Sequence, residues 1–246
     1  MMTEQEKYLF DLQGYLVVPN ALSAEQIAVL NALVDARLSA EVTPDAPNHR
    51  FGRILNWGKP TLDVLDNPRI LPKLEAILGE GLRLDHEYCD VIRSRRGPIG
   101  FTLHGGGTPF DPSQFYRCEN GRIRCGLTVV AYNLHDVNVG DGGFGCMPGS
   151  HKSNFRLPQE WANLENENDL VAKITGAAGT AIIFTEALTH GTLPWNASHE
   201  RRTLFYKYSP QPLSWSWGYY SAEDYPNATP RQHELLKMPS MRDSKV

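Results

Sequence analysis

The chain has 246 residues, of which 41% are hydrophobic and 21% charged, and its formal net charge is -4. This length suffices for one domain with a substantial core and is short for two, so we expect a single domain over residues 1–246. The weakly acidic balance gives no electrostatic basis for binding a nucleic-acid polymer or an anionic membrane, and it favours a small-molecule substrate as the partner.

The N-terminal residues and the cysteines indicate a cytoplasmic protein. Glu4, Glu6 and Lys7 stand where a signal peptide would need an apolar run, and no later stretch approaches the ~20 apolar residues of a membrane span. The cysteines lack CxxC spacing, so neither a zinc site nor a disulfide framework is expected at this length. We expect reduced, mostly buried thiols at Cys89, Cys118, Cys125 and Cys146.

Residues 1–80 have a helical pattern. Ser23 and Gln26 form a capping-box signature ahead of apolar residues at helical spacing. A second helix is predicted from Pro68 to Leu78, because proline is favoured in a first turn and Gly79 follows the last apolar position. This N-terminal part is therefore expected to be helical and to pack against the rest of the domain.

From Leu82 onward the pattern changes to that of strands. Apolar and polar residues alternate after Leu82, and clusters of Gly and Pro separate the later β-rich runs. These runs lie at residues 127–132, 180–184 and 203–206. We predict a mainly β protein with flanking α-helices. Its core, an antiparallel jelly roll over about residues 81–210, would be followed by an aromatic C-terminal tail.

Two histidines at expected strand ends indicate a metal site. His104 follows a strand-like run and precedes three glycines, and His190 ends another β-rich run. Non-haem iron is commonly held by two His and one carboxylate, and imidazoles from two strand ends can bind one ion. Arg201 begins the next β-rich run, where its planar guanidinium could pair with the carboxylate of a chelating 2-oxo acid.

These residues, together with the Gly-rich segment 136–152, resemble the phytanoyl-CoA dioxygenase family of Fe(II)/2-oxoglutarate oxygenases. The Pro-Gly-Ser-His-Lys turn at residues 148–152 is the most specific part of a resemblance that extends from about residue 8 to about residue 210. The resemblance implies a double-stranded β-helix of cupin-like form. It also implies Fe(II) on His104 and His190, 2-oxoglutarate with its distal carboxylate on Arg201, and O2 as co-substrate.

The chain departs from the family at Gly106. The family pattern is His-x-Asp or His-x-Glu, whereas this chain has His104-Gly105-Gly106. The departure resembles the Fe(II)/2-oxoglutarate halogenases, which carry Gly or Ala at this position. It implies a halide site at Gly106, because chloride would replace both the missing ligand and the missing negative charge. We therefore favour a halogenase that chlorinates an unactivated C–H bond, with chloride as a further cofactor.

Two alternatives stay open. A carboxylate from elsewhere in the chain could replace the missing ligand and make the enzyme a hydroxylase, and the candidates are Asp111, Asp136 and Glu186. The chain could also be a small-molecule binding domain that retains the fold without catalysis.

Basic and aromatic side chains give an expectation for the substrate. Arg93, Arg95 and Arg96 precede His104 in the chain and could bind a phosphate or carboxylate group. Similarity to nucleotide halogenases implies a phosphorylated small molecule such as a deoxyadenosine nucleotide, whose base would stack on an aromatic ring. The aromatic candidates are Trp57, Phe144 and Trp195.

Overall fold

The computed structural model describes residues 1–93 and 101–241. Arg95 and Arg96 therefore lie outside the described residues. In the described ranges the helices are α1 (Glu4–Gln13), α2 (Ala24–Glu41), α3 (Lys59–Leu65), α4 (Leu71–Leu78) and α5 (Pro230–Leu235). The strands are β1 (Tyr15–Val18), β2 (Asn48–Gly52), β3 (Leu82–Ile92), β4 (Tyr116–Glu119), β5 (Arg122–Cys125), β6 (Thr128–Asn133), β7 (Gly143–Cys146), β8 (Ala172–Lys173), β9 (Ala181–Thr185), β10 (His190–Leu193) and β11 (Arg201–Pro210).

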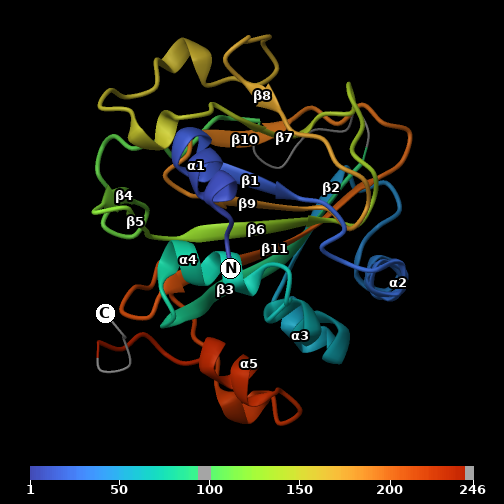
Figure 1. The fold of residues 1–246 in the computed structure, drawn as a ribbon. Helices are drawn as coiled ribbons and strands as arrows, with labels where there is room; N and C mark the ends of the chain where they lie inside the picture. Colours follow the sequence, from blue (N-terminus) through green and yellow to red (C-terminus); the bar gives the residue numbers. More distant parts are fainter. Residues whose placement is uncertain (94–100, 242–246) are drawn as a thin grey trace.

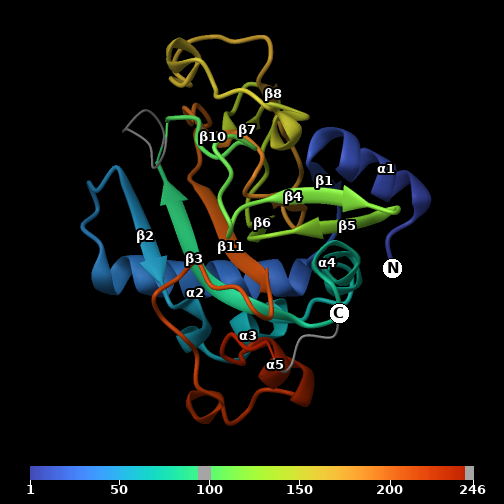
Figure 2. The same cartoon turned by 90° about the vertical axis from the view of Figure 1, so that its left-hand side faces the viewer.

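Two antiparallel sheets pack against each other, as the predicted jelly roll requires. The large sheet has the order β1-β9-β6-β11-β3-β2, and the small sheet has the order β10-β7-β8 (Figure 1). Apolar side chains from both sheets meet in one cluster that includes Ala131 of β6, Phe144 of β7 and Phe205 of β11. The hairpin β4-β5 lies beside the sheets, at the left in Figure 1 and at the front in Figure 2. The prediction of a mainly β fold with flanking helices is confirmed.

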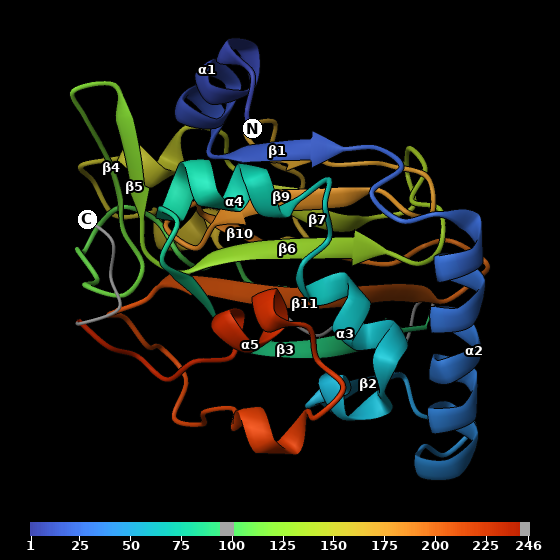
Figure 3. The ribbon, with the colours of Figure 1, turned by 60° about the horizontal axis from the view of Figure 1, so that its bottom comes forward.

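The helices cover the outer face of the large sheet. Figure 3 shows α3, α4 and α5 over this face and α2 across the ends of the strands. The main core lies between them and contains Val34, Leu74 and Leu204, which are all at most 1% exposed. Two buried tyrosines of β11 also join the layers, because Tyr206 and Tyr208 each donate a hydrogen bond of 2.7 Å to a backbone carbonyl of α3.

The alternation of β11 determines which side chains enter the space between the sheets. Leu204 and Tyr206 point into the helix-covered core, so Thr203, Phe205 and Lys207 point to the opposite face. Because β11 lies between β6 and β3 in the sheet, this inner row lies near the middle of the fold.

The helical expectation for residues 1–80 is only partly correct. The capping box at Ser23 and Gln26 is present, and it begins α2. However, Tyr15–Val18 forms β1 at one edge of the large sheet, beside β9, and Asn48–Gly52 forms β2 at the other edge, beside β3. These short strands exist because they pair with distant segments, which local periodicity does not reveal. The predicted 68–78 helix begins at Leu71, after a turn in which the Asn67 carbonyl accepts from two backbone amides.

Within the described part of the chain, no helix combines the length and apolarity that crossing a membrane would require.

Candidate active site

The backbone holds His104 and His190 side by side. Each residue donates its amide hydrogen to the carbonyl of the other, and both N···O distances are 2.9 Å. This isolated antiparallel bridge brings the two imidazole rings to a centroid distance of 4.3 Å. Two residues that are far apart in the sequence therefore present their side chains at one point, as the sequence predicted for a shared metal ion.

Both imidazoles have the same nitrogen available. His104 Nδ1 lies 3.0 Å from the carbonyl oxygen of Thr102, and His190 Nδ1 lies 2.7 Å from that of Leu188. Since a carbonyl only accepts hydrogen bonds, we assign the proton of each neutral ring to Nδ1. Each Nε2 then keeps a free lone pair. A backbone carbonyl on the opposite ring nitrogen is the usual support of a metal-binding histidine.

Glu186 completes a group of three possible ligands. One ligand atom each from His104, Glu186 and His190 lie within 4.8 Å of one another. Glu186 follows β9 directly, and its Oε2 is 3.8 Å from Nε2 of His190. Two imidazoles and one carboxylate form the ligand set that non-haem Fe(II) uses.

The other two carboxylates that the sequence offered are engaged elsewhere. Asp111 Oδ1 accepts hydrogen bonds from the backbone amide and the hydroxyl of Ser113. Asp136 Oδ1 accepts from the amide of Ala178. Neither belongs to the cluster of His104, Glu186 and His190, so among the three alternatives the structure brings only Glu186 to the histidines.

The electrostatics of the cluster prepare it for a cation. Burial would raise the pKa of Glu186, but the ammonium of Lys207 and the nearby imidazoles outweigh it and lower this pKa to about 2. Burial lowers the pKa of His190 to about 4, although Glu186 opposes the shift. At neutral pH Glu186 is therefore an anion and His190 a neutral base, and both are the protonation states that metal binding needs.

The glycines after His104 let the chain pass close to this cluster. A Cβ at Gly105 would stand 2.5 Å from the backbone oxygen of Glu186 and 2.6 Å from that of Leu188, so no side chain fits there. Gly106 has a φ of +106°, and a Cβ there would lie 3.1 Å from Thr189 Oγ1. Residues with side chains rarely adopt this backbone conformation. An Asp or Glu at position 106 would therefore be strained here.

Arg201 is a buried cation with unused donors. It is 3% exposed, and its Nε and Nη1 have no hydrogen-bond partner among the residues that the structure describes. Burial lowers its pKa, and the nearby carboxylate of Asp90 opposes this shift without pairing directly, because both oxygens of Asp90 accept from Arg50 at 2.7 Å. A buried guanidinium with free N–H groups fits a ligand carboxylate, since that ligand would satisfy both charge and donors.

The predicted substrate residues fall into two groups. Phe144 and Trp195 are buried near the site: the ring of Phe144 is 5.9 Å from that of His190, and a Cβ on Gly143 would contact both Trp195 and Arg201. Trp57 instead packs against Phe51 at the helix-covered face.

Arg93, from the basic cluster before His104, is occupied by the protein itself. Its Nε donates to Glu200 at 2.8 Å, and its Nη1 lies within hydrogen-bonding distance of the backbone carbonyls of Thr43, Pro44 and Ala46. These contacts join β3 to the loop after α2. They account for the charge of Arg93 without a substrate group.

Lys207 is a candidate functional residue that the sequence analysis did not predict. Its Nζ donates to Oε1 of Glu186 at 2.5 Å, and its side chain is 13% exposed. It also lies over the ring of Tyr88, with Nζ 5.6 Å from the centroid. The signal that could have found it is the alternation from Arg201, since every second residue of a strand shares a face.

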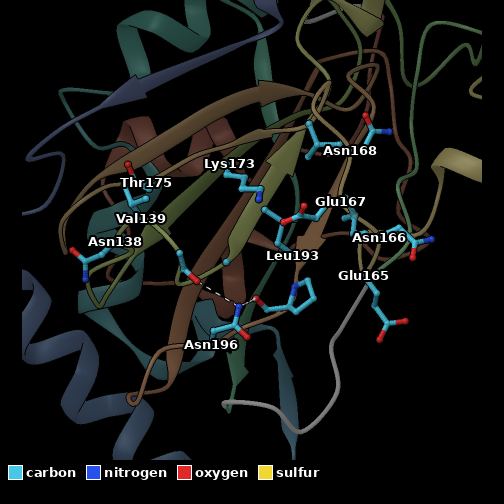
Figure 4. A pocket seen from close by; sticks show the side chains of 15 residues that line it. Asn138, Val139, Glu165, Asn166, Glu167, Asn168, Lys173, Thr175, Leu193 and Asn196 are labelled. Atoms are coloured by element: carbon cyan, nitrogen blue, oxygen red, sulfur yellow. Dashed lines mark hydrogen bonds between the residues drawn. The ribbon is translucent and has the colours of Figure 1, made fainter.

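A separate cavity of 230 Å³ opens beside the small sheet, and neither histidine lines it. Its lining is rich in Asn and Glu side chains (Figure 4). Asn196 donates there to the carbonyls of Gly140 and Pro194. The cluster of His104, Glu186 and His190 is therefore a different place from this surface cavity.

Comparison with known proteins shows the family and the fold. The family model described as phytanoyl-CoA dioxygenase (PhyH) matches residues 10–203. HygX from Streptomyces hygroscopicus, solved with nickel and 2-oxoglutarate bound, is 22% identical with a TM-score of 0.79 over 87% of this chain and 89% of its own.

Two enzymes of nogalamycin biosynthesis share the fold. The non-heme alpha ketoglutarate dependent epimerase SnoN is 17% identical, with a TM-score of 0.62 over 85% of this chain and 83% of its own. The carbocyclase SnoK is 15% identical, with a TM-score of 0.63 over 86% of this chain and 85% of its own. At these identities the likeness shows the fold alone. No curated protein matches the chain.

Proposed function

Because this chain belongs to the phytanoyl-CoA dioxygenase family of Fe(II)/2-oxoglutarate oxygenases, we propose that it oxidises a C–H bond of a small molecule with Fe(II) held by His104, His190 and Glu186. The observation that carries this proposal is the convergence of their three ligand atoms within 4.8 Å. Glu186 takes the role that the family gives to the carboxylate two residues after the first histidine.

The side chains around the cluster have distinct tasks in this proposal. When bound, Fe(II) and 2-oxoglutarate supply with O2 the oxidant that removes hydrogen from an unactivated carbon. Arg201 holds the distal carboxylate of 2-oxoglutarate through the donors that are otherwise unused. Phe184, whose ring is 4.7 Å from that of His190, and Phe144 provide an apolar wall on the His190 side of the cluster.

A carboxylate ligand favours oxygen transfer over halogenation. Glu186 brings the negative charge that chloride would otherwise supply, so hydroxylation or a related C–H oxidation is the first candidate outcome. Chlorination is the second candidate, and two observations favour it. Gly106 has no side chain, and Lys207 already pairs with one oxygen of Glu186.

The substrate class is a small molecule. HygX has been solved with hygromycin B bound, and SnoN in complex with nogalamycin RO, so neighbours with this fold bind small molecules. The phosphorylated nucleotide expected from the sequence stays a prediction, since Arg95 and Arg96 lie outside the described residues and Arg93 is paired with Glu200.

The test is anaerobic reconstitution with Fe(II) and 2-oxoglutarate, followed by the visible metal-to-ligand charge-transfer band. We expect a band in the natural protein that chloride does not change, and loss or a marked shift of the band in Glu186→Gln. Asp136→Asn is the matched control, because it removes an exposed carboxylate outside the cluster, and its band should equal that of the natural protein.

Other outcomes discriminate between the alternatives. A band that shifts saturably with chloride, and that Glu186→Gln leaves unchanged, would favour the halogenase. The absence of any band in the natural protein would contradict the metal site and favour a non-catalytic binding domain.

A further inference from the structure

Glu186 presents its two oxygens to different partners. Oε1 accepts from Lys207 at 2.5 Å, whereas Oε2 lies 3.8 Å from Nε2 of His190. Both side chains of the ion pair are largely buried, with 13% of Lys207 and 5% of Glu186 exposed. The contact is therefore shielded from water and from salt, unlike an ion pair on the surface.

The protein also fixes the position of the ammonium group. Nζ of Lys207 lies 5.6 Å from the ring centroid of Tyr88 and 5.9 Å from that of Trp215. Trp215 is held in turn, because its backbone amide donates at 2.9 Å to the buried carboxylate of Asp85. Two aromatic faces and one carboxylate thus surround the cation, and each attracts it.

We propose that Lys207 is a positioning residue that limits Glu186 to ligation through one oxygen, Oε2. This inference rests on the proposed function, since it assumes that Glu186 binds the metal. A carboxylate can bind a metal through one oxygen or through both. While Lys207 occupies Oε1, only Oε2 is available, and the coordination position that Oε1 would fill stays open for 2-oxoglutarate or O2.

Strand β11 carries both cations that act in this scheme. Lys207 and Arg201 lie six residues apart on β11, so they project to the same face of the strand. In this scheme Arg201 binds the far end of 2-oxoglutarate, and Lys207 preserves the position at which its near end chelates. Removal of the Lys207 charge should consequently weaken 2-oxoglutarate binding even though Lys207 does not contact 2-oxoglutarate.

The test uses Co(II) in place of Fe(II), because its visible spectrum reports coordination number without turnover. We expect Lys207→Met to bind Co(II) with an altered d–d spectrum and to bind 2-oxoglutarate roughly tenfold or more weakly than the natural protein, as losses of supporting partners do. Lys207→Arg keeps a donor and a positive charge, so it should retain most of the natural affinity and spectrum.

Lys73→Met is the matched control. Lys73 also forms a 2.5 Å ion pair, with Glu6, and its side chain is 14% exposed, but it lies outside the cluster. Its loss should leave the Co(II) spectrum and the affinity for 2-oxoglutarate unchanged. Lys207→Ala, which removes the donor and leaves space for water, is measured beside Lys207→Met so that misfolding of one variant does not decide the result.

Two failures are distinguishable. If the Lys207→Met or Lys207→Ala protein is folded and shows the natural Co(II) spectrum with 2-oxoglutarate affinity within about twofold, the positioning role is overturned, whatever Glu186 does. If Glu186→Gln itself keeps the natural Co(II) spectrum, Glu186 is not a ligand, and the proposed ligand set fails first.

Discussion

Arg201 is predicted to destabilise the free protein and to stabilise the complex. Its side chain is buried, and within residues 1–93 and 101–241 its Nε and Nη1 have no acceptor. Each buried donor without a partner costs about 1–3 kcal/mol, so two of them correspond to roughly 2–6 kcal/mol. Attraction to Asp90 offsets part of this cost. We therefore expect Arg201→Met to raise the free energy of unfolding of the metal-free protein by about 2 kcal/mol, within the range for replacement of buried charges by apolar side chains.

The assay is thermal unfolding with and without 2-oxoglutarate. For a chain of this length, about 2 kcal/mol corresponds to a Tm increase of roughly 4–8 °C in the metal-free state. With Ni(II) present, 2-oxoglutarate at one hundred times its Kd should stabilise the natural protein by about 2.7 kcal/mol. Arg201→Met should gain almost nothing from 2-oxoglutarate, because the residue that holds the distal carboxylate is gone.

Two results would refute this reasoning. If metal-free Arg201→Met unfolds at a lower temperature than the natural protein, the unpartnered guanidinium is not a source of instability. If 2-oxoglutarate protects both proteins equally, Arg201 does not bind it. Arg50→Met serves as a comparison, because Arg50 has a bidentate partner in Asp90 and its loss should lower the Tm.

Three further predictions concern the neighbourhood of the site. Gly105→Ala should lower the free energy of unfolding by more than Gly121→Ala, because both glycines have positive φ but, of the two, only Gly105 would place a Cβ against backbone oxygens. Urea denaturation of the two variants should give free energies of unfolding that differ by more than about 1 kcal/mol. Equal losses would contradict the close approach of the backbone at Gly105. Burial lowers the pKa of His151 to about 4 from 6.5, so the unfolded chain takes up a proton first and stability falls as the pH drops from 6.5 to 4. His151→Gln should remove about 3 kcal/mol of this loss in denaturation curves across that range, and parallel curves for the two proteins would show that His151 does not titrate this way. Addition of a chelator should lower the Tm of the metal-loaded natural protein, and it should leave the Tm of His104→Ala unchanged. A chelator that still lowers the Tm of His104→Ala would place the metal elsewhere.

The convergence of the two histidines could be predicted from local pattern, and their role as metal ligands stays a prediction. His104, His190 and Arg201 each stand at the start or end of a β-rich run, and the structure places both histidines together with their Nε2 atoms free. Glu186 was one of three open carboxylates. The choice among them depends on the fold of the connection between β9 and β10, which places the Glu186 carboxylate beside the imidazole of His190.

Contacts that depend on the pairing of distant segments could not be predicted, even where strand alternation indicates the face on which a residue lies. Lys207 meets Glu186 across a gap of 21 residues, and that meeting follows from how β11 and the end of β9 are placed in three dimensions. Arg93 shows the opposite error. It is close to His104 in the sequence, yet its guanidinium turns toward the carbonyls of residues 43–46. Nearness along the chain therefore overstated its connection with the site.

The register of β11 constrains how enzymes of this design can diversify. Insertion of one residue between Arg201 and Lys207 would turn one of these two cations into the apolar layer beneath the helices and away from the cluster of His104, Glu186 and His190. Changes of substrate should therefore accumulate in loops that leave this strand intact. A library that randomises the exposed turns while fixing the length of β11 would explore new substrates at little risk to the cofactor chemistry.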